Sequence, residues 1–128
     1  MAMPNVSQKN NDRRQRGQDG EQRARLHLEQ HGLRCLDAGW RCRLGELDLV
    51  MRDNDALIFV EVRARQTGSL VGAIESVDHR KQQRFVRAAR AWLACHPVEA
   101  TLPARFDVIA VIDDEIRWLR NAFDVAPH

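Results

Sequence analysis

Two acidic residues interrupt the most apolar, strand-forming part of the sequence, the segment from Gly45 to Arg65. Asp48 is flanked by leucines, and Glu61 is flanked by valines. Carboxylates covered by protein are costly to ionise, and two of them close together also repel each other. A shared proton or a bound cation removes this cost, and hard divalent ions favour carboxylate oxygens. The two acids therefore could form part of a site for an ion such as Mg²⁺.

Two strands joined by a short turn are expected to position these acids. The first strand is predicted over residues 45–51 and the second over residues 56–65, because both segments are rich in β-branched and large apolar residues. The sequence RDNDA between them is typical of a turn. Side chains alternate across a strand, so each acid shares a face of the sheet with every second residue of its own strand.

The length of the turn decides which acids meet. A turn formed by Asn54 and Asp55 would place Asp48 opposite Glu61, with their Cβ atoms roughly 4.5–5.5 Å apart. A turn centred one residue earlier would instead pair Glu46 with Glu61. A loop with an odd number of residues, or a bulge, would put the acids on different faces.

The alternative is that Glu46 and Asp48 simply face solvent on an exposed hairpin. Leu57 and Phe59 argue against it, because they share the face of Glu61. A face that carries large apolar groups is at least partly covered by protein, and covered acids need a partner.

A helix is predicted from Asp19 to Gln30, with Asp19 as a possible N-cap. Glu21, Ala24 and Leu28 share one face of this helix by their spacing. Because the apolar members of that face would pack against the sheet, Glu21 also points inward and could add a third acid to the site.

A second helix is predicted from Asp78, as its N-cap, to His96, and Pro97 stops it. Lys81 lies on the apolar face of this helix. It could help at the site, or it could be an ordinary lysine whose stem packs on apolar neighbours while its amine reaches water. A stripe of basic residues lies beside the apolar face, and it either faces solvent or contacts a nucleic acid. The stripe consists of Arg80, Arg84 and Arg87.

The remaining segments complete an α/β domain. The sequence predicts extended pieces at 33–36 and 40–44 separated by a bend at Gly39, a loop at 66–72, a buried strand at 105–112 and an outer strand at 115–120. The resulting order is α-β-β-β-α-β-β, which favours a single domain with a mixed central sheet flanked by helices.

The composition permits a nucleic-acid partner without requiring one. The chain has 128 residues, 30% of them charged, and a net charge of only +2. Lys9 and Lys81 are the only lysines among 20 basic residues, so arginine dominates, and its planar fork matches phosphate oxygens. Residues 1–16 are polar and predicted to be a disordered basic tail, with the folded domain spanning 17–128.

Location and partners can also be anticipated. The first residues show no apolar stretch of a secretory signal, and no segment is apolar for long enough to cross a membrane. The three cysteines form no CxxC pair, so reduced, mostly buried thiols are expected. These features favour a cytoplasmic protein without a membrane partner. Whether it is a monomer or a homodimer stays open.

Several motifs together resemble a known family. GELDLV followed by IFVEVRAR resembles the D…E-x-K core of restriction-endonuclease-like nucleases. With GEQRA, WRCRL, RFDV, NAF and the lysine near the start of the second helix, the chain is similar to the bacterial UPF0102 (YraN-like) family over most of its length. That family is considered distantly similar to archaeal Holliday-junction resolvases.

The resemblance implies a restriction-endonuclease-like fold and a metal-dependent endonuclease that hydrolyses phosphodiester bonds in DNA, with branched or structured DNA among its substrates. It assigns Glu21, Asp48 and Glu61 as ligands of Mg²⁺ or Mn²⁺. We expect supporting roles behind these ligands for Glu46 and Asp107, although Asp107 could equally pair with Arg105. As residues that contact nucleic acid, we predict Arg63, Arg65, Arg80, Lys81 and Arg84.

Arg63 occupies the lysine position of the E-x-K pattern, where this chain departs from many such nucleases. Arginine stays protonated at ordinary pH and so cannot activate water as a base, although it can orient a phosphate and offset negative charge. This departure supports a rival interpretation, a nucleic-acid-binding module of the same fold with little or no catalytic activity. A protein-interaction domain with the acids as charged surface is the third possibility.

Overall fold

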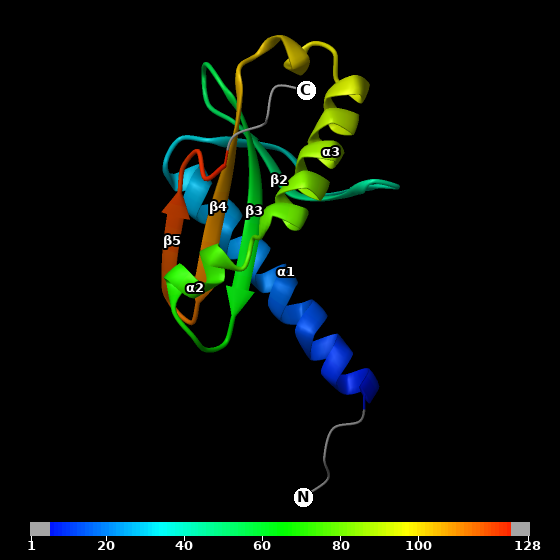
Figure 1. Ribbon diagram of the computed structural model, residues 1–128. Helices are drawn as coiled ribbons and strands as arrows, with labels where there is room; N and C mark the ends of the chain where they lie inside the picture. The colour runs from blue at the N-terminus through cyan, green and yellow to red at the C-terminus, as the bar shows by residue number, and fades with distance from the viewer. Residues whose placement is uncertain (1–5, 124–128) are drawn as a thin grey trace, which may run out of the picture.

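The computed structural model describes residues 6–123 and shows five strands and three helices arranged in layers (Figure 1). The sheet has the order β1-β2-β3-β4-β5, with β3 and β4 parallel and the other neighbours antiparallel. This is the predicted single-domain α/β fold with a mixed sheet flanked by helices. The elements are α1 (Val6–Gln30), β1 (Arg34–Cys42), β2 (Gly45–Arg52), β3 (Leu57–Arg65), α2 (Leu70–Glu75), α3 (His79–Cys95), the 3₁₀ turn η1 (Glu99–Thr101), β4 (Ala104–Ile112) and β5 (Glu115–Leu119).

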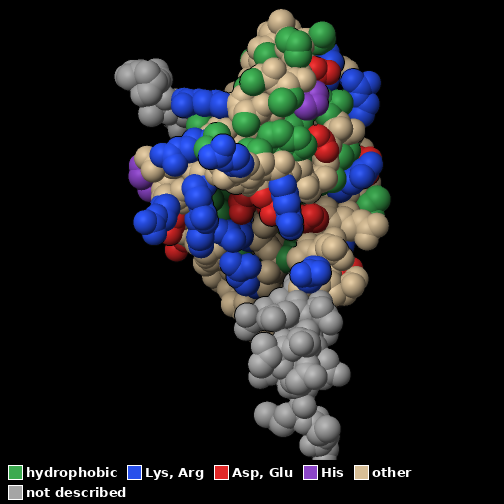
Figure 2. Space-filling model, turned by 90° about the vertical axis from the view of Figure 1, so that its right-hand side faces the viewer, with side chains coloured by type: hydrophobic (Ala, Val, Ile, Leu, Met, Phe, Trp, Pro, Cys, Tyr) green, Lys and Arg blue, Asp and Glu red, His purple; other side chains and the backbone are tan. Residues whose placement is uncertain are grey.

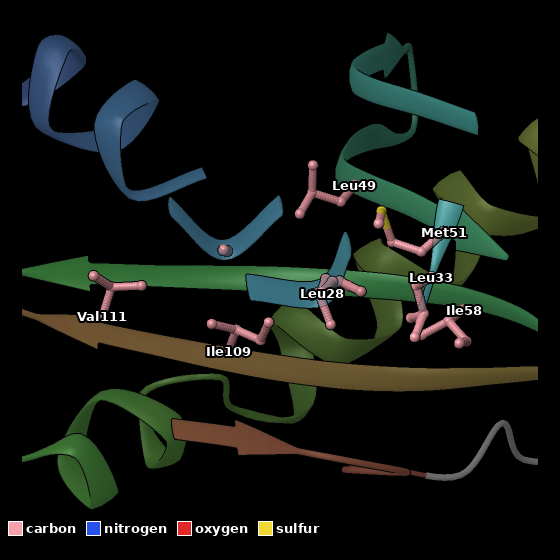
Figure 3. Close-up of a cluster of buried hydrophobic side chains, with 9 residues drawn as sticks. Leu28, Leu33, Leu49, Met51, Ile58, Ile109 and Val111 are labelled. Carbon is pink, nitrogen blue, oxygen red and sulfur yellow. The ribbon is translucent and has the colours of Figure 1, made fainter. Parts of the chain in front are cut away.

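Helix α1 covers one face of the sheet, and Figure 3 shows the apolar cluster between them. Ala24 and Leu28 are completely buried there, as their helical spacing predicted. Alternate residues of the strands supply the other side of the cluster, because successive side chains of a strand point to opposite faces. These residues are Leu49, Met51, Ile58, Val60, Ile109 and Val111.

Helices α2 and α3 cover the opposite face (Figure 1). Phe59 from β3 stacks on Phe106 from β4, with ring centroids 5.5 Å apart, and meets Trp92 of α3 edge-on at 5.9 Å. The caps of α3 are those expected, since the Asp78 side chain accepts a hydrogen bond from the Lys81 amide (2.9 Å) and His96 follows the last turn. Helix α3 thus packs mainly on β2, and the contact of Phe59 with Trp92 joins it to β3.

Three predicted boundaries were wrong. Helix α1 begins at Val6 rather than at Asp19, so residues 6–16 of the expected disordered tail are helical, which suits a stretch rich in Gln and Arg. Residues 1–5 of that tail lie outside the described residues. The two expected pieces at 33–36 and 40–44 are one strand with a register shift between Cys35 and Asp37. The start of α2 lies in the expected loop.

The short helix α2 was missed because only six residues support it, too few for a clear apolar period. Its start is nevertheless marked, since the Ser69 hydroxyl accepts a hydrogen bond from the Gly72 amide (2.9 Å). The three cysteines are free, but they are not mostly buried as expected, since Cys35 and Cys42 are half-buried and Cys95 is exposed. Among residues 6–123, no helix is both long enough and apolar enough to traverse a lipid bilayer.

Candidate functional site

The β2–β3 turn sets the register that brings the acids together. Asp53 donates its amide to the Ala56 carbonyl (3.1 Å), and Leu49 pairs with Val60 further along the ladder. The turn residues are therefore Asn54 and Asp55, as one of the predicted alternatives required. The ladder ends one residue before Asp48 and Glu61, and the two carboxyl groups lie next to each other just beyond its last pair.

Asp48 lies where the pairing of β2 with β3 ends. The last paired residues are Leu49 and Val60, and beyond them the Asp48 carboxylate accepts a hydrogen bond from the Val62 amide (2.8 Å). The carboxylate therefore takes the position that a backbone carbonyl of β2 would have occupied in a continuing ladder. This bond fixes the side chain between the two diverging strands.

Helix α1 adds Glu21 to this position. The helix can approach closely because Gly20 faces Ala64 of β3, and a Cβ atom at Gly20 would overlap the Ala64 Cβ. Carboxylate oxygens of Glu21, Glu46 and Asp48 all lie within 4.8 Å of one another. Glu46, expected only to support the ligands, is thus a full member of the cluster, and it also pairs with Arg41 at 3.4 Å.

Burial and mutual repulsion favour the protonated forms of these acids. Burial, followed by the charge of Asp48 and a hydrogen bond to it, raises the pKa of Glu21 to about 7. Burial and the same neighbour raise the pKa of Glu61 to about 8, although the Arg63 guanidinium opposes the shift. Burial also raises the pKa of Asp48, against the hydrogen bond from Val62. Asp48 therefore lies next to both Glu21 and Glu61 and hydrogen-bonds each of them.

Basic side chains face these acids across a cavity of about 580 Å³. Asp48, Glu46 and Glu61 line it, and Glu21 reaches the cluster from α1. Figure 2 shows acidic side chains in the middle of this face, with Lys and Arg side chains around them. The basic residues lining the cavity are Arg41, Arg63, Lys81 and Arg84.

Arg63 and Lys81 converge on one backbone carbonyl at the junction between α2 and α3. The Lys81 amine donates to the Ser76 carbonyl at 3.0 Å, and an Arg63 guanidinium nitrogen lies 3.5 Å from the same oxygen. The Arg63 Nε is buried 3.8 Å from Glu61 Oε1, and it has no hydrogen-bond acceptor within residues 6–123. An N–H group that is buried and unpaired beside a cavity can donate to a ligand there.

Two of the predicted nucleic-acid contacts lie outside this cavity. Arg80 is exposed and does not line it. Arg65 is also exposed, hydrogen-bonds the Ala64 carbonyl (2.9 Å) and borders a separate depression beside Asp19 and Arg23. Arg65 is the last residue of β3, where it pairs with Ile112 of β4, so it lies beyond the part of the strand that lines the cavity. Arg63, Lys81 and Arg84 are the predicted contacts that the structure brings together.

Asp107 does not support the acid cluster, so that expectation was wrong. Its side chain is completely buried and accepts hydrogen bonds from Arg105 Nε (3.0 Å), Trp118 Nε1 (2.8 Å) and the Asn121 amide (2.9 Å). The alternative pairing with Arg105 is the one observed. Asp107 therefore ties β4 to β5 and to the segment that follows β5.

Two site residues were not recognised from the sequence. The Ser76 carbonyl carries no signal in its residue type, because any residue offers a backbone oxygen. Arg41 had a detectable signal, since it pairs directly opposite Glu46 in the β1–β2 hairpin and opposite charges favour such positions.

Fold and site together define a class of protein, an α/β domain whose mixed sheet presents clustered carboxylates beside basic side chains in one cavity. The model of the family described as "Uncharacterised protein family UPF0102" matches residues 20–111 of the chain. The chain belongs to this family.

Relatives cover most of the chain at high identity. A UPF0102 protein of Halorhodospira halophila is 52% identical over 113 residues, which are 88% of this chain and 90% of the relative. A UPF0102 protein of Stutzerimonas stutzeri is 47% identical over 84% of this chain and 93% of its own length. The UPF0102 protein NE0719 of Nitrosomonas europaea is 45% identical over 85% of this chain and 93% of its own length. The family resemblance of the sequence motifs is thus confirmed.

Proposed function

We propose that this protein is a metal-dependent nuclease that hydrolyses phosphodiester bonds in DNA. The observation that carries the proposal is the convergence of Glu21, Glu46 and Asp48, with Glu61 next to Asp48 and close to an Arg63 Nε that has no hydrogen-bond acceptor among residues 6–123. Acids and bases placed in this way suit a cation and a phosphate bound next to each other.

The acid cluster fits a hard divalent ion. Its donors are all carboxylate oxygens, which Mg²⁺ and Mn²⁺ favour, and the raised pKa values mark charges that lack sufficient compensation from the protein. Asp48 and Glu61 would be the principal ligands, with Glu21 and Glu46 close enough to join them or to hold ordered water. Such an ion, when bound, would polarise the phosphate and favour deprotonation of a water molecule.

The basic residues would bind and orient the phosphate. Arg63 is held between Glu61 and the Ser76 carbonyl, so its guanidinium is positioned before the substrate arrives. Lys81 keeps two donor hydrogens after bonding Ser76 and can place them on a phosphate oxygen. Neither Arg63 nor Arg84 can accept a proton, so their contribution is to offset the charge that develops on the phosphate.

The direct test is cleavage of end-labelled linear, flapped and four-way DNA with Mg²⁺ or Mn²⁺. The wild type should cleave at least one substrate, and Glu61→Gln should reduce the rate by about 10²-fold or more because a principal ligand is lost. Glu75→Gln, an exposed acid outside the cavity, is the matched control and should leave the rate unchanged. Equal cleavage by wild type and Glu61→Gln would assign the activity to another site or to a contaminant.

The identity of Arg63 supports one alternative to the nuclease, a DNA-binding module with little or no cleavage activity. Its guanidinium fills the place of a lysine that could exchange a proton. Under this alternative, DNA binding would persist with no cleavage in either metal, and Glu61→Gln would bind as well as the wild type. Arg63→Lys separates the two ideas, since it should raise or preserve cleavage in a nuclease and only weaken binding in a module.

A further inference from the structure

The β1–β2 hairpin ends in an exposed tip formed by Arg41, Arg43 and Leu44, here called the hairpin tip. Cys42 pairs with Gly45, so Arg43 and Leu44 form a two-residue turn. Figure 1 shows the hairpin extending past α3, away from the rest of the sheet. The Leu44 residue is 52% exposed and the Arg41 side chain 79% exposed. The tip thus presents a large apolar side chain among cations.

The turn itself does not call for these residues. Two-residue hairpin turns favour Asn, Asp and Gly, and the β2–β3 turn of the same chain follows this preference with Asn54 and Asp55. Arg43 and Leu44 both adopt negative φ, and Gly45 takes the positive φ of 157° that follows them. A short polar residue would serve the backbone at Leu44 at least as well, so its apolar side chain has no local structural reason.

The hairpin tip is held in place and continues the wall of the acid site. Gly45 packs so closely on α3 that a Cβ atom there would lie 3.1 Å from the Arg84 carbonyl oxygen and 3.6 Å from the Ala88 Cβ. Arg41 and Gly45 line the same cavity as Asp48. A tip whose base is fixed on α3 loses less entropy on binding than a free loop would, which favours binding through it.

We propose that the hairpin tip is a wedge that inserts Leu44 between base pairs of duplex DNA while Arg41 and Arg43 bind the flanking phosphates. The inference rests on the proposed function and assigns a substrate class to that site. Apolar side chains that enter a base step unstack it at a cost of about a few kcal/mol, and arginines at the grooves or backbone offset this cost. The cost is lowest where pairing is already interrupted, so nicked, flapped or branched duplexes are the preferred substrates.

The position of the wedge sets a distance that can be measured. Leu44 and Asp48 are four residues apart on β2 and its turn, which corresponds to ~13 Å at the usual strand rise. Stacked bases rise ~3.4 Å each, so the unstacked step should lie about four base pairs from the phosphate at the acid cluster.

Fluorescence of 2-aminopurine tests the wedge, because this base brightens when it loses its stacked neighbours. The analogue is placed at successive positions around the branch of a flapped duplex, and anisotropy of an end label reports binding of the same DNA. Ca²⁺ is present throughout, since carboxylates bind it as they would Mg²⁺. The wild type should brighten the analogue several-fold at one position near the branch, about four base pairs from the cleavage point mapped with Mg²⁺.

Leu44→Ala should lose most of that increase, about fivefold or more, with a smaller loss of affinity, whereas Leu44→Met should retain it because Met also supplies an apolar wedge. Val98→Ala is the matched control, because Val98 is 73% exposed and does not line the cavity. It should behave as the wild type. Thermal melts of each variant verify that these exposed substitutions leave the fold intact.

The outcomes separate the wedge from the nuclease. Binding with no brightening in the wild type, or equal brightening in wild type and Leu44→Ala, overturns the wedge while the proposed function stands. Brightening that depends on Leu44 without cleavage in Mg²⁺ or Mn²⁺ supports the wedge and overturns the nuclease. Absence of DNA binding overturns both.

Discussion

At the residue scale, this protein uses buried acids in two opposite ways. Asp107 is surrounded by donors from Arg105, Trp118 and Asn121, which satisfy its charge completely. Asp48 receives one backbone amide and otherwise meets further acids. Satisfied acids hold a fold together, whereas acids crowded by like charges have free energy to gain from a ligand.

Glu61→Gln should make the metal-free protein more stable than the wild type, by an amount that grows as pH rises. The folded-state pKa of Glu61 is about 8, against 4.5 for the free group, so between these values the folded state binds more protons than the unfolded state. The free energy of unfolding of the wild type therefore falls as pH rises through this window, and below about pH 4.5 the effect vanishes. Glutamine removes the titration, and by pH 8 the variant should gain on the order of 2 kcal/mol relative to the wild type.

Urea unfolding from pH 4 to pH 8 in a chelating buffer measures this difference. Glu75→Gln, at an exposed position, should show a difference that does not change with pH. A flat difference for Glu61→Gln as well would mean that this carboxyl is already ionised in the folded protein.

Asp107→Ala should destabilise the protein by ~2–4 kcal/mol, because three donors lose their completely buried acceptor. Asp107→Asn keeps part of the acceptor capacity and should cost less. Chemical unfolding measures both losses, and calorimetric titration with Mn²⁺ should give the wild-type affinity for each folded variant. If an Asp107 variant had normal stability but failed to bind Mn²⁺, Asp107 would have to support the acid site after all.

At the scale of elements, close packing of backbone against backbone places the acids. Helix α1 can deliver Glu21 because Gly20 lets it approach Ala64 of β3, and β2 can deliver Glu46 and Asp48 because Gly45 lets the hairpin approach α3. The turn of Asn54 and Asp55 then sets the register between β2 and β3. Three local features thus converge on one cavity.

Gly20→Ala should destabilise the domain by ~1–3 kcal/mol, since the added Cβ would overlap the Ala64 Cβ and push α1 away from β3. The matched control is Gly17→Ala on the same helix, where nothing lies within 4 Å of an added Cβ. That change should be neutral or stabilise by up to ~1 kcal/mol, as Ala favours a helix over Gly.

Thermal melts distinguish these variants, and Gly20→Ala combined with Ala64→Gly should recover part of the loss because space is returned at the same contact. Equal effects of Gly17→Ala and Gly20→Ala would show that helix propensity, rather than the contact with β3, governs both positions.

At the scale of the whole molecule, the acid cluster should couple metal binding to folding. A ligand present at 100 times its dissociation constant stabilises the folded state by about 2.7 kcal/mol. Protons compete with the metal for Glu21 and Glu61, whose pKa values are about 7 and 8. Mn²⁺ should therefore raise the melting temperature more at pH 8 than at pH 5.

Differential scanning calorimetry at the two pH values measures this coupling, with Asp48→Asn as the comparison because it removes the central acid. The variant should show little metal-dependent shift at either pH. An equal shift in wild type and variant would place metal binding elsewhere on the protein.

Local patterns in the sequence were sufficient to predict much of the fold and part of the acid site. Alternation along β2 and β3 and the polar turn at Asn54 and Asp55 predicted the register that ends beside Asp48 and Glu61, since register between strands joined by a tight turn depends only on nearby residues. Spacing in α3 and the cap at Asp78 predicted its extent equally well.

Only the tertiary structure decided which other residues join the site. It brought Glu46 into the cluster and directed Lys81 and Arg63 to the Ser76 carbonyl, while it withdrew Asp107 and Arg65. These outcomes depend on how α1, the α2–α3 junction and β5 pack against the sheet. Packing joins segments far apart in the chain, and no local period or turn preference encodes which of their side chains will meet.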